Sequence, residues 1–261
     1  MPTIVTLTTD LGTQDAFVGA VKGVLLSQCP DAQIVDITHD IPPQAVRTGA
    51  LRLASAAPYF PAGTVHLAVV DPGVGGERRP IAVEANAQHF VGPDNGVLSL
   101  AAPTMSAGWR AVELTNPAHR LSQLSNTFHG RDLFAPAAAH LACGGALEDL
   151  GDEVDAIIEL ALPRPRRDGD TLHGVVLDVD RFGNVITNVR AADLAGRSVA
   201  QVMVGDARID GLSTAYDDSR RAVALIDSDD RLEVAVPGGS AAIAFGVGLD
   251  DPVEIRLRPL P

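Results

Sequence analysis

Charged side chains that can do chemistry follow apolar stretches at three points in the first third of the chain. Asp10 ends TIVTLTTD, His39 and Asp40 end QIVDITHD, and Asp71 ends the run before PGVGGERRP, which contains Arg78. Carboxylates and imidazoles can bind hydroxyl groups, neutralise a cation or accept a proton from an attacking water. Ligands of an open parallel sheet bind beyond the carboxyl ends of its strands, so we expect these residues to share one site.

Two further motifs contain residues of the same kind. NTFHGRD, residues 126–132, places Phe128 and His129 at an expected entry from a loop into a helix. DVDRFGNVITN, residues 178–188, places Asp180, Phe182 and Asn184 in one turn. So many acids and histidines, with an aromatic residue and an amide, favour an active site over a simple binding scaffold.

Each motif also has an ordinary structural interpretation. Asp15 and Asp132 can cap the helices that follow them. The turn at 180–184 can be a hairpin in which glycine supplies the positive φ and Phe182 belongs to the core. His39 and His129 can be hydrogen-bonded structural histidines. Asp71 and Arg78 can form a structural ion pair.

The elements that position these motifs alternate in the first half of the chain. The pattern predicts strands at residues 3–9, 33–38, 64–70, 80–85 and 111–114. It predicts helices from Phe17 to just before Pro30, over 44–57 and over 131–143. This order is typical of a doubly wound or Rossmann-like α/β domain.

The pattern changes after residue 160. Residues 163–171 combine proline, charge and glycine, which predicts a linker between an N-terminal domain over 1–162 and a C-terminal domain over 172–261. Short segments separated by Gly, Asp and Ser turns predict strands at 174–179, 185–189, 199–204, 222–226, 232–236, 241–245 and 253–257. Such spacing suggests a small β-barrel or sandwich.

Composition limits the partners. The formal net charge is −13, and no Lys/Arg stripe is present, so nucleic acid is not expected as a partner. No apolar run approaches the roughly 18 residues of a membrane span, and no basic stretch precedes the first apolar run, so we expect a soluble, cytoplasmic protein. Cys29 and Cys143 lack metal-ligand spacing, and we expect reduced thiols in the core.

Taken together and in order, several motifs carry a family resemblance. TTDLGTQDAFVGAVKGVL, ITHDIPPQ, VVDPGVGGERRPIAV, GPDNGVLS, NTFHGRDLFAPAAAHLA and DRFGNVITNV resemble the S-adenosyl-L-methionine (SAM) hydroxide adenosyltransferases, or SAM hydrolases, which are relatives of fluorinating and chlorinating SAM enzymes. The resemblance implies a Rossmann-like N-terminal domain, a C-terminal β-barrel and a homotrimer. It also implies a SAM site between one subunit's N-terminal domain and a neighbour's C-terminal domain, and cleavage of SAM by water into adenosine and L-methionine.

The chemistry of that reaction agrees with these residue types. A neutral thioether leaves from a sulfonium, so the leaving group needs neither a proton nor a metal, and no cofactor is implied besides SAM as the substrate. Only the water needs alignment and a proton acceptor. By resemblance, Asp71, Arg78 and His129 handle the water. The base can be Asp71 or His129, or the nucleophile can be hydroxide stabilised by Arg78 and His129.

The resemblance also assigns substrate contacts. Asp10 would accept hydrogen bonds from both ribose hydroxyls, and Asp15 with Asp180 would neutralise the methionine ammonium group. Asn184 would bind an adenine edge and Phe182 would offer a stacking face. Further positions that match the family's binding residues, or that are expected to contact the ligand, are Phe128, Ser228, Glu233 and the backbone at Val236 and Gly238.

Differences from the halogenating relatives predict hydroxide as the nucleophile. Those relatives carry tyrosine where this chain has Asp71, threonine where it has Val74 and a Tyr-Ser pair where it has His129 and Gly130. They also carry a carboxylate-binding arginine where this chain has Asp229, which leaves open how the methionine carboxylate is held. The alternative functions are a non-catalytic nucleoside or SAM-binding protein, a SAM-dependent halogenase and an Asp/His metal hydrolase.

Overall fold

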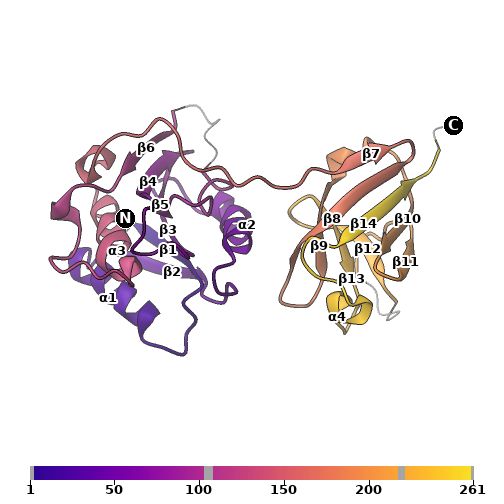
Figure 1. Ribbon diagram of the computed structural model, residues 1–261, viewed down its shortest axis with the longest axis horizontal. Coiled ribbons are helices and arrows are strands. Elements are labelled where there is room, and N and C mark those ends of the chain that lie inside the picture. Colours follow the sequence, from indigo (N-terminus) through magenta and orange to yellow (C-terminus); the bar gives the residue numbers. More distant parts are fainter. Residues whose placement is uncertain (1–2, 103–107, 217–220, 260–261) are drawn as a thin grey trace. The chain divides into compact units, whose positions relative to one another are not determined.

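The computed structural model of the protein describes residues 3–102, 108–216 and 221–259, and the chain divides into two compact units (Figure 1). Unit 1 comprises residues 1–160 and unit 2 comprises residues 161–261. Each unit has its own sheet and its own buried core.

Unit 1 is a mixed α/β unit whose elements follow the hydrophobic pattern. Val5 and Leu7 of the first strand are fully buried, and the first helix buries Val18, Val21 and Leu25 at helical spacing. Its elements are β1 (Ile4–Thr9), α1 (Phe17–Gln28), β2 (Gln33–Thr38), α2 (Val46–Ala56), β3 (Val65–Val69), β4 (Pro80–Ala85), β5 (Gln88–Pro93), β6 (Arg110–Glu113), the π-helical turn η3 (Gly130–Phe134) and α3 (Ala135–Ala142), with shorter 3₁₀ turns at Ala57–Tyr59, Pro117–His119 and Leu147–Leu150.

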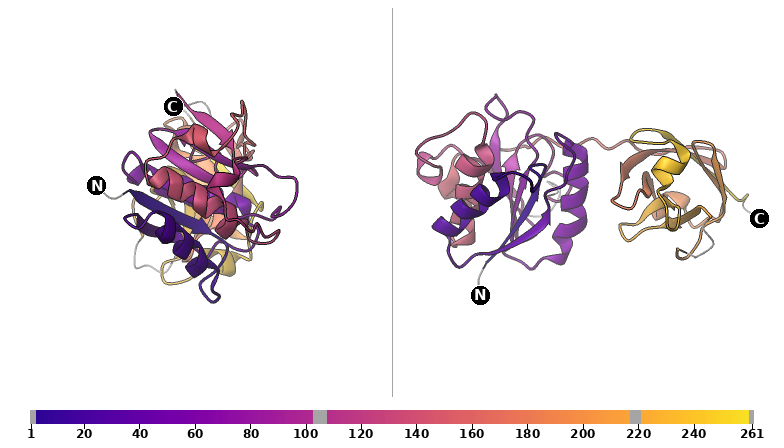
Figure 2. Two further views of the ribbon diagram at one scale, coloured as in Figure 1. Left: turned by 90° about the vertical axis from the view of Figure 1, so that its left-hand side faces the viewer. Right: turned by 90° about the horizontal axis from the view of Figure 1, so that it is seen from below.

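The six strands of unit 1 lie in the order β2-β1-β3-β5-β4-β6. β1 pairs in parallel with β2 and β3, and β3 pairs in parallel with β5, whereas β4 is antiparallel to β5 and β6. Helices α1 and α3 cover one face of the sheet and α2 covers the other (Figures 1 and 2). The carboxyl ends of β1, β2 and β3 therefore meet at one edge, as the sequence predicts.

Strand β5 was not predicted. It follows β4 after a two-residue turn in which Asn86 and Ala87 both have positive φ, 53° and 59°. Hairpin turns of this kind usually carry glycine at the second position. Because alanine stands there, the turn lacks its usual sequence signal.

The expectation of reduced cysteines is wrong. Cys29 follows α1 and Cys143 follows α3, and the two residues form a disulfide across a sequence separation of 114 residues, with their Cα atoms 5.8 Å apart. Helices α1 and α3 pack side by side, which brings their C-terminal ends together. Their spacing in the sequence carries no sign of this pairing.

Unit 2 contains an antiparallel, barrel-like sheet that is nearly closed. Its strands lie in the order β11-β10-β14-β8-β9-β13-β12, and β7 pairs with β8 within the segment expected to be a linker. The elements are β7 (Arg166–Asp168), β8 (Thr171–Val179), β9 (Val185–Arg190), a 3₁₀ turn (Ala191–Leu194), β10 (Val199–Val204), β11 (Ala207–Asp210), β12 (Val223–Ile226), β13 (Arg231–Ala235), α4 (Ala241–Phe245) and β14 (Pro252–Leu257).

One predicted strand of unit 2 is a helix. Residues 241–245 form α4, and the Ser240 hydroxyl caps it by accepting a hydrogen bond from the backbone N–H of Ile243 at 3.2 Å. A short apolar run does not distinguish a strand from a helix by periodicity alone. The serine cap just before the run was the available signal.

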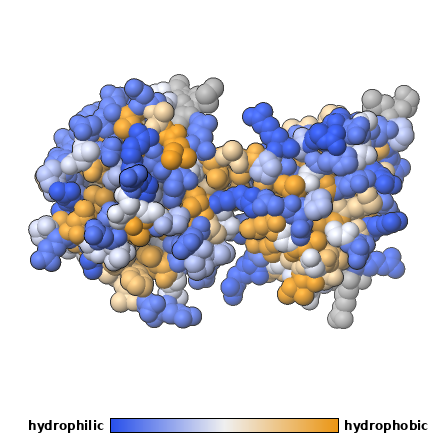
Figure 3. All heavy atoms as spheres, viewed as in Figure 1, coloured by the Kyte–Doolittle hydropathy of each residue, from blue (hydrophilic) through white to orange (hydrophobic). Residues whose placement is uncertain are grey.

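Hydrophilic residues cover most of the face seen in Figure 3, among scattered apolar patches. Large exposed apolar side chains include Phe17 in unit 1 and Phe182 and Ile243 in unit 2. Within the three described ranges, no helix is both long and apolar enough to cross a bilayer.

A buried histidine in β3 should make the stability of unit 1 depend on pH. His66 is fully buried, its Nδ1 lies 2.7 Å from the Thr6 hydroxyl, and its ring stacks on Phe90 at 4.9 Å between ring centroids. Burial lowers the pKa of His66 to about 4. Between this value and the ordinary value of 6.5, the unfolded chain binds the proton more readily than the native protein.

We therefore expect the neutral His66 to stabilise unit 1 fully above pH 6.5. That contribution is lost as the pH falls toward 4, by up to about 3 kcal/mol. Glutamine in the His66→Gln variant cannot titrate. The difference in free energy of unfolding between wild type and this variant should therefore shrink as the pH falls over this range. Urea unfolding followed by the fluorescence of Trp109, the chain's single tryptophan, measures this in unit 1. A constant difference between the two proteins from pH 7.5 to 4.5 would contradict it.

Candidate active site

Asp71 and Arg78 form a forked ion pair just beyond β3. Arg78 donates from Nε to both carboxylate oxygens at 2.9 and 3.0 Å, and from Nη2 to Oδ2 at 2.5 Å. The Asp71 side chain is 5% exposed and that of Arg78 is 10% exposed. The guanidinium also lies over the ring of Phe134, 5.2 Å from its centroid. Such contacts fix the plane and position of the cation.

His129 completes this group as a hydrogen-bond acceptor. Its Nδ1 lies 2.7 Å from Arg78 Nη2, and a guanidinium can only donate. Nδ1 must therefore be unprotonated, so the proton of the neutral ring sits on Nε2. Burial, reinforced by the charge of Arg78, lowers the pKa of His129 and keeps the ring neutral. The Asp71, Arg78 and His129 predicted as catalytic are thus joined by hydrogen bonds, and His129 offers an N–H donor at Nε2.

A glycine makes the approach of Arg78 and His129 possible. The two residues lie on different loops, 51 positions apart, and Gly75 in the first loop packs against the backbone of Asn126 in the second. Gly75 has φ +73°, and a Cβ there would overlap the Asn126 carbonyl oxygen. Only glycine allows both this conformation and this approach.

The π-helical turn η3 holds the loop before His129. Asp132 is fully buried, its Oδ2 accepts from the Ser125 N–H at 2.8 Å, and its Oδ1 accepts from Arg131 Nε at 2.5 Å. Asp132 makes no side-chain cap at this helix start, so the capping interpretation is wrong. The Arg131 guanidinium lies 5.0 Å from the ring centroid of Phe128 and helps to fix this predicted contact residue.

Asp10 lies at the same sheet edge, beyond β1. Its Oδ2 accepts a hydrogen bond from the backbone N–H of Gln44 at 2.8 Å. Gln44 has φ 66°, an uncommon conformation for a side chain other than glycine, and it belongs to the IPPQ segment. Asp15 lies exposed on the turn that follows. It does not cap α1, because Ala16 is the N-cap residue and makes no side-chain capping bond.

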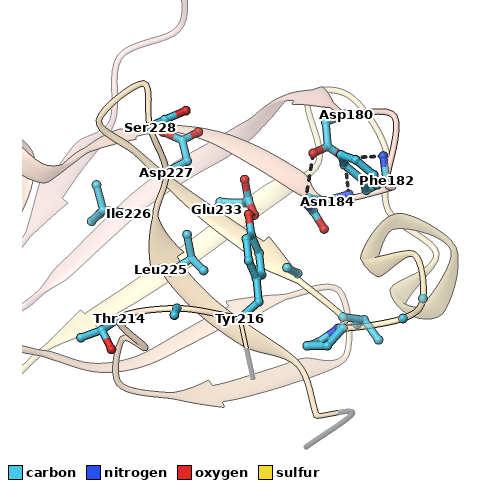
Figure 4. A pocket seen from close by; sticks show the side chains of 16 residues that line it. Asp180, Phe182, Asn184, Thr214, Tyr216, Leu225, Ile226, Asp227, Ser228 and Glu233 are labelled. Carbon is cyan, nitrogen blue, oxygen red and sulfur yellow. Dashed lines mark hydrogen bonds between the residues drawn. The ribbon is translucent and has the colours of Figure 1, made fainter. Parts of the chain in front are cut away.

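Unit 2 contains a cavity of about 1050 Å³. The walls come from the turn after β8, the loop before β12 and strands β12 and β13 with the segments that follow them (Figure 4). Every predicted contact residue of unit 2 lines it: Asp180, Phe182, Asn184, Ser228, Glu233, Val236 and Gly238.

The turn at 180–184 forms one rim of this cavity. Asp180 Oδ1 accepts from the backbone N–H groups of Phe182 and Asn184, both at 2.8 Å, and Asp180 Oδ2 accepts from the Asn184 side-chain amide at 3.0 Å. Gly183 supplies the expected positive φ, 81°. Phe182 is 78% exposed, so its interpretation as a core residue is wrong.

The sequence analysis missed Tyr216. Its phenol donates to Glu233 Oε1 at 2.6 Å, and both residues line the cavity (Figure 4). A single aromatic residue in the polar stretch GLSTAYDDS was the available signal, since such loops otherwise lack aromatic side chains.

No group of three or more His, Cys, Asp or Glu side chains among the described residues is arranged to hold a metal ion. The charged groups of the site instead hydrogen-bond to one another and to backbone N–H groups.

The fold is that of a two-unit protein with an α/β unit, which holds the hydrogen-bonded Asp71–Arg78–His129 group, and an antiparallel β unit. The chain belongs to the SAM hydroxide adenosyltransferase family. The N-terminal domain of that family matches residues 5–151 and the C-terminal domain matches residues 174–254.

The chain is similar to individual proteins over nearly its whole length. An (R)-S-adenosyl-L-methionine hydrolase from Salinispora arenicola is 42% identical over 255 residues, which cover 96% of this chain and 97% of the relative. The crystal structure of an uncharacterized conserved protein from Thermotoga maritima superposes with a TM-score of 0.88 at 36% identity, covering 97% of this chain and 99% of that one. A fluorinase from Nocardia brasiliensis is 29% identical over 293 residues, with 98% and 96% covered.

The contact between Gly75 and the Asn126 backbone should contribute to the stability of unit 1. Gly75→Ala should destabilise unit 1 by roughly 1–3 kcal/mol more than Gly63→Ala, because the added methyl group must displace the Asn126 backbone. Gly63 is the matched control, since it also has positive φ, +83°, but faces open space. Urea unfolding followed by Trp109 fluorescence gives both values, and equal losses would show that the loops do not depend on this contact.

Proposed function

We propose that this protein hydrolyses SAM to adenosine and L-methionine, with a Rossmann-like N-terminal domain and a C-terminal β-barrel. The observation that carries the proposal is the hydrogen-bonded group Asp71–Arg78–His129 at the carboxyl edge of the unit 1 sheet. A binding protein has no need of this group. Family membership and the (R)-S-adenosyl-L-methionine hydrolase named above support the same reaction.

The hydrogen bonds of His129 favour hydroxide as the nucleophile. Nδ1 is occupied by Arg78, so His129 can take up a proton only by giving up that bond beside a fixed cation. The Nε2 N–H and the guanidinium are donors, which suit an anion more than a neutral water. We infer that Arg78 and His129 stabilise hydroxide, formed by loss of a water proton to solvent, and that Asp71 orients Arg78.

Hydroxide then displaces methionine at the ribose C5′. The new C–O bond forms as the C–S bond breaks. The electron pair of the C–S bond stays on sulfur, so the cationic sulfonium becomes a neutral thioether. No proton is needed by the leaving group, and the step uses no metal or further cofactor. Holding the nucleophile in line accounts for much of the expected acceleration.

The substrate contacts follow from the same assignment. Asp10 would bind the ribose hydroxyls, oriented by the Gln44 N–H, while Asp15 and Asp180 would face the methionine ammonium group. Asn184 donates its amide N–H to Asp180, which directs its oxygen to an adenine amino group. Phe182 would stack on the ligand. Further contacts are proposed at Phe128, Ser228, Glu233, Val236 and Gly238.

The first test is the reaction itself. SAM incubated with the protein in ¹⁸O-labelled water and concentrated chloride should yield methionine and adenosine as the sole nucleoside, with ¹⁸O in the 5′-hydroxyl group. Chromatography with mass spectrometry identifies the products. Formation of 5′-chloro-5′-deoxyadenosine would make chloride the nucleophile, and methylthioadenosine alone would indicate a different bond cleavage.

The second test concerns the catalytic group. Asp71→Ala and His129→Ala should each slow hydrolysis by about 10²-fold or more, because each removes the orientation or a donor of the nucleophile site. SAM affinity should change little. His119→Ala, a histidine whose ring contacts His140 instead, is the matched control and should keep its rate. Full activity in both Asp71 and His129 variants would remove this group from the mechanism.

We further propose a homotrimer in which unit 1 of one subunit and unit 2 of a neighbour complete each site. A cytoplasmic location also remains a prediction. For assembly, light scattering should give three times the 27.1 kDa mass of the chain.

Complementation tests the shared site directly. Asp10→Asn and Asn184→Ala should each lose activity, and mixed oligomers of the two variants should regain part of it, because some sites then combine two intact halves. Two variants that never complement each other after subunit exchange would mean that both residues of a site come from one chain.

A further inference from the structure

The cavity of unit 2 contains a buried carboxylate that accepts a hydrogen bond from an uncharged phenol. Glu233 lies in β13, its residue surface is 4% exposed, and its Oε1 accepts from the Tyr216 phenol at 2.6 Å. Figure 4 shows Tyr216 extending from its loop toward Glu233, with Asn184 and Asp180 on one side and Asp227 on the other. This pair lies at the centre of the cavity wall.

The lining of the cavity is acidic. Asp180, Asp227 and Glu233 line it, and none of the described lining residues is Lys, Arg or His. The first two carboxylates also stabilise turns: Asp180 accepts from two backbone N–H groups, and Asp227 Oδ1 accepts from the N–H groups of Asp229 and Arg231 at 2.9 and 2.8 Å. Among the described residues, the Glu233 side chain accepts no such hydrogen bond from a backbone N–H group and accepts instead from Tyr216.

A buried carboxylate beside two other acids is unfavourable without a cation. Burial, together with the charges of Asp180 and Asp227, raises the pKa of Glu233. Burial and the bond to Glu233 raise the pKa of the Tyr216 phenol, so it remains a donor at neutral pH. A positively charged ligand group would supply a countercharge that none of the described lining residues provides.

We infer that Tyr216 and Glu233 recognise the positive charge of the ligand's amino-acid half, with Glu233 as the countercharge and Tyr216 as the residue that positions its carboxylate. The identity of the ligand rests on the proposed function. SAM carries two such charges, the sulfonium and the ammonium group. The pair thereby distinguishes SAM from the product adenosine, which has neither charge and would be released more readily.

Substitutions that keep the shape isolate this role. Glu233→Gln keeps an oxygen that can accept from Tyr216 but removes the charge. Tyr216→Phe keeps the ring and removes only the donor. Matched controls are Glu254→Gln, a carboxylate of β14 that accepts from Arg256, and Tyr59→Phe, an exposed tyrosine of unit 1.

Calorimetric titration with SAM, S-adenosylhomocysteine and adenosine measures the effect, with His129→Ala as the background so that little SAM is consumed during the titration. Glu233→Gln should weaken SAM binding about 10-fold and Tyr216→Phe about 3-fold or more, with adenosine affinity unchanged. Homocysteine derivatives keep only the ammonium charge, so weakened binding of S-adenosylhomocysteine assigns the contact to ammonium, and unchanged binding assigns it to sulfonium.

Equal weakening of SAM and adenosine, or normal SAM binding by Glu233→Gln, would overturn the inference and leave a structural pair. These outcomes differ from failure of the proposed function, in which the wild-type protein neither binds SAM nor forms adenosine from it.

Discussion

The proposed active site depends on the contacts that the Arg78 guanidinium makes with Asp71 and His129. The guanidinium is largely buried, so it needs compensation, and Asp71 supplies this through a forked ion pair. The fork uses Nε and Nη2, and Nη2 also reaches His129. One cation thus fixes a carboxylate, sets the tautomer of a histidine and leaves that histidine with a donor. Lysine has no planar fork and could not hold both partners in this way.

This arrangement changes what the residue types alone suggest. Asp, Arg and His together are compatible with general base catalysis by either the Asp carboxylate or the His imidazole. The hydrogen bonds observed occupy the Asp71 oxygens with Arg78 and the His129 Nδ1 with the same guanidinium. The group is therefore better suited to stabilising an anion than to accepting a proton, which agrees with a reaction between hydroxide and a sulfonium.

The two units have complementary electrostatic features. Unit 1 presents donors beside Arg78, while the cavity of unit 2 is lined by carboxylates and no described cationic residue. An anionic nucleophile and a cationic substrate need surroundings of opposite sign. In the proposed function, the donors of unit 1 would suit the anionic nucleophile and the carboxylates of unit 2 would suit the cationic substrate.

Local sequence determined much of the fold and most candidate residues. β-branched runs and helical spacing located β1, β2, β3, α1 and α2, and the residues after the strands included Asp10 and Asp71. These features depend on neighbours a few positions apart, so periodicity and turn residues reveal them. The same reasoning missed β5, whose turn lacks glycine, and mistook α4 for a strand.

Only the tertiary structure decided which of those residues meet. The disulfide joins positions 114 residues apart, Arg78 reaches His129 across 51 positions and Tyr216 reaches Glu233 across 17. The His129 tautomer and the raised pKa of Glu233 follow from those contacts and from burial. The sequence alone therefore specified the elements and the reactive side chains, whereas their protonation and partners depended on packing between segments that no local pattern connects.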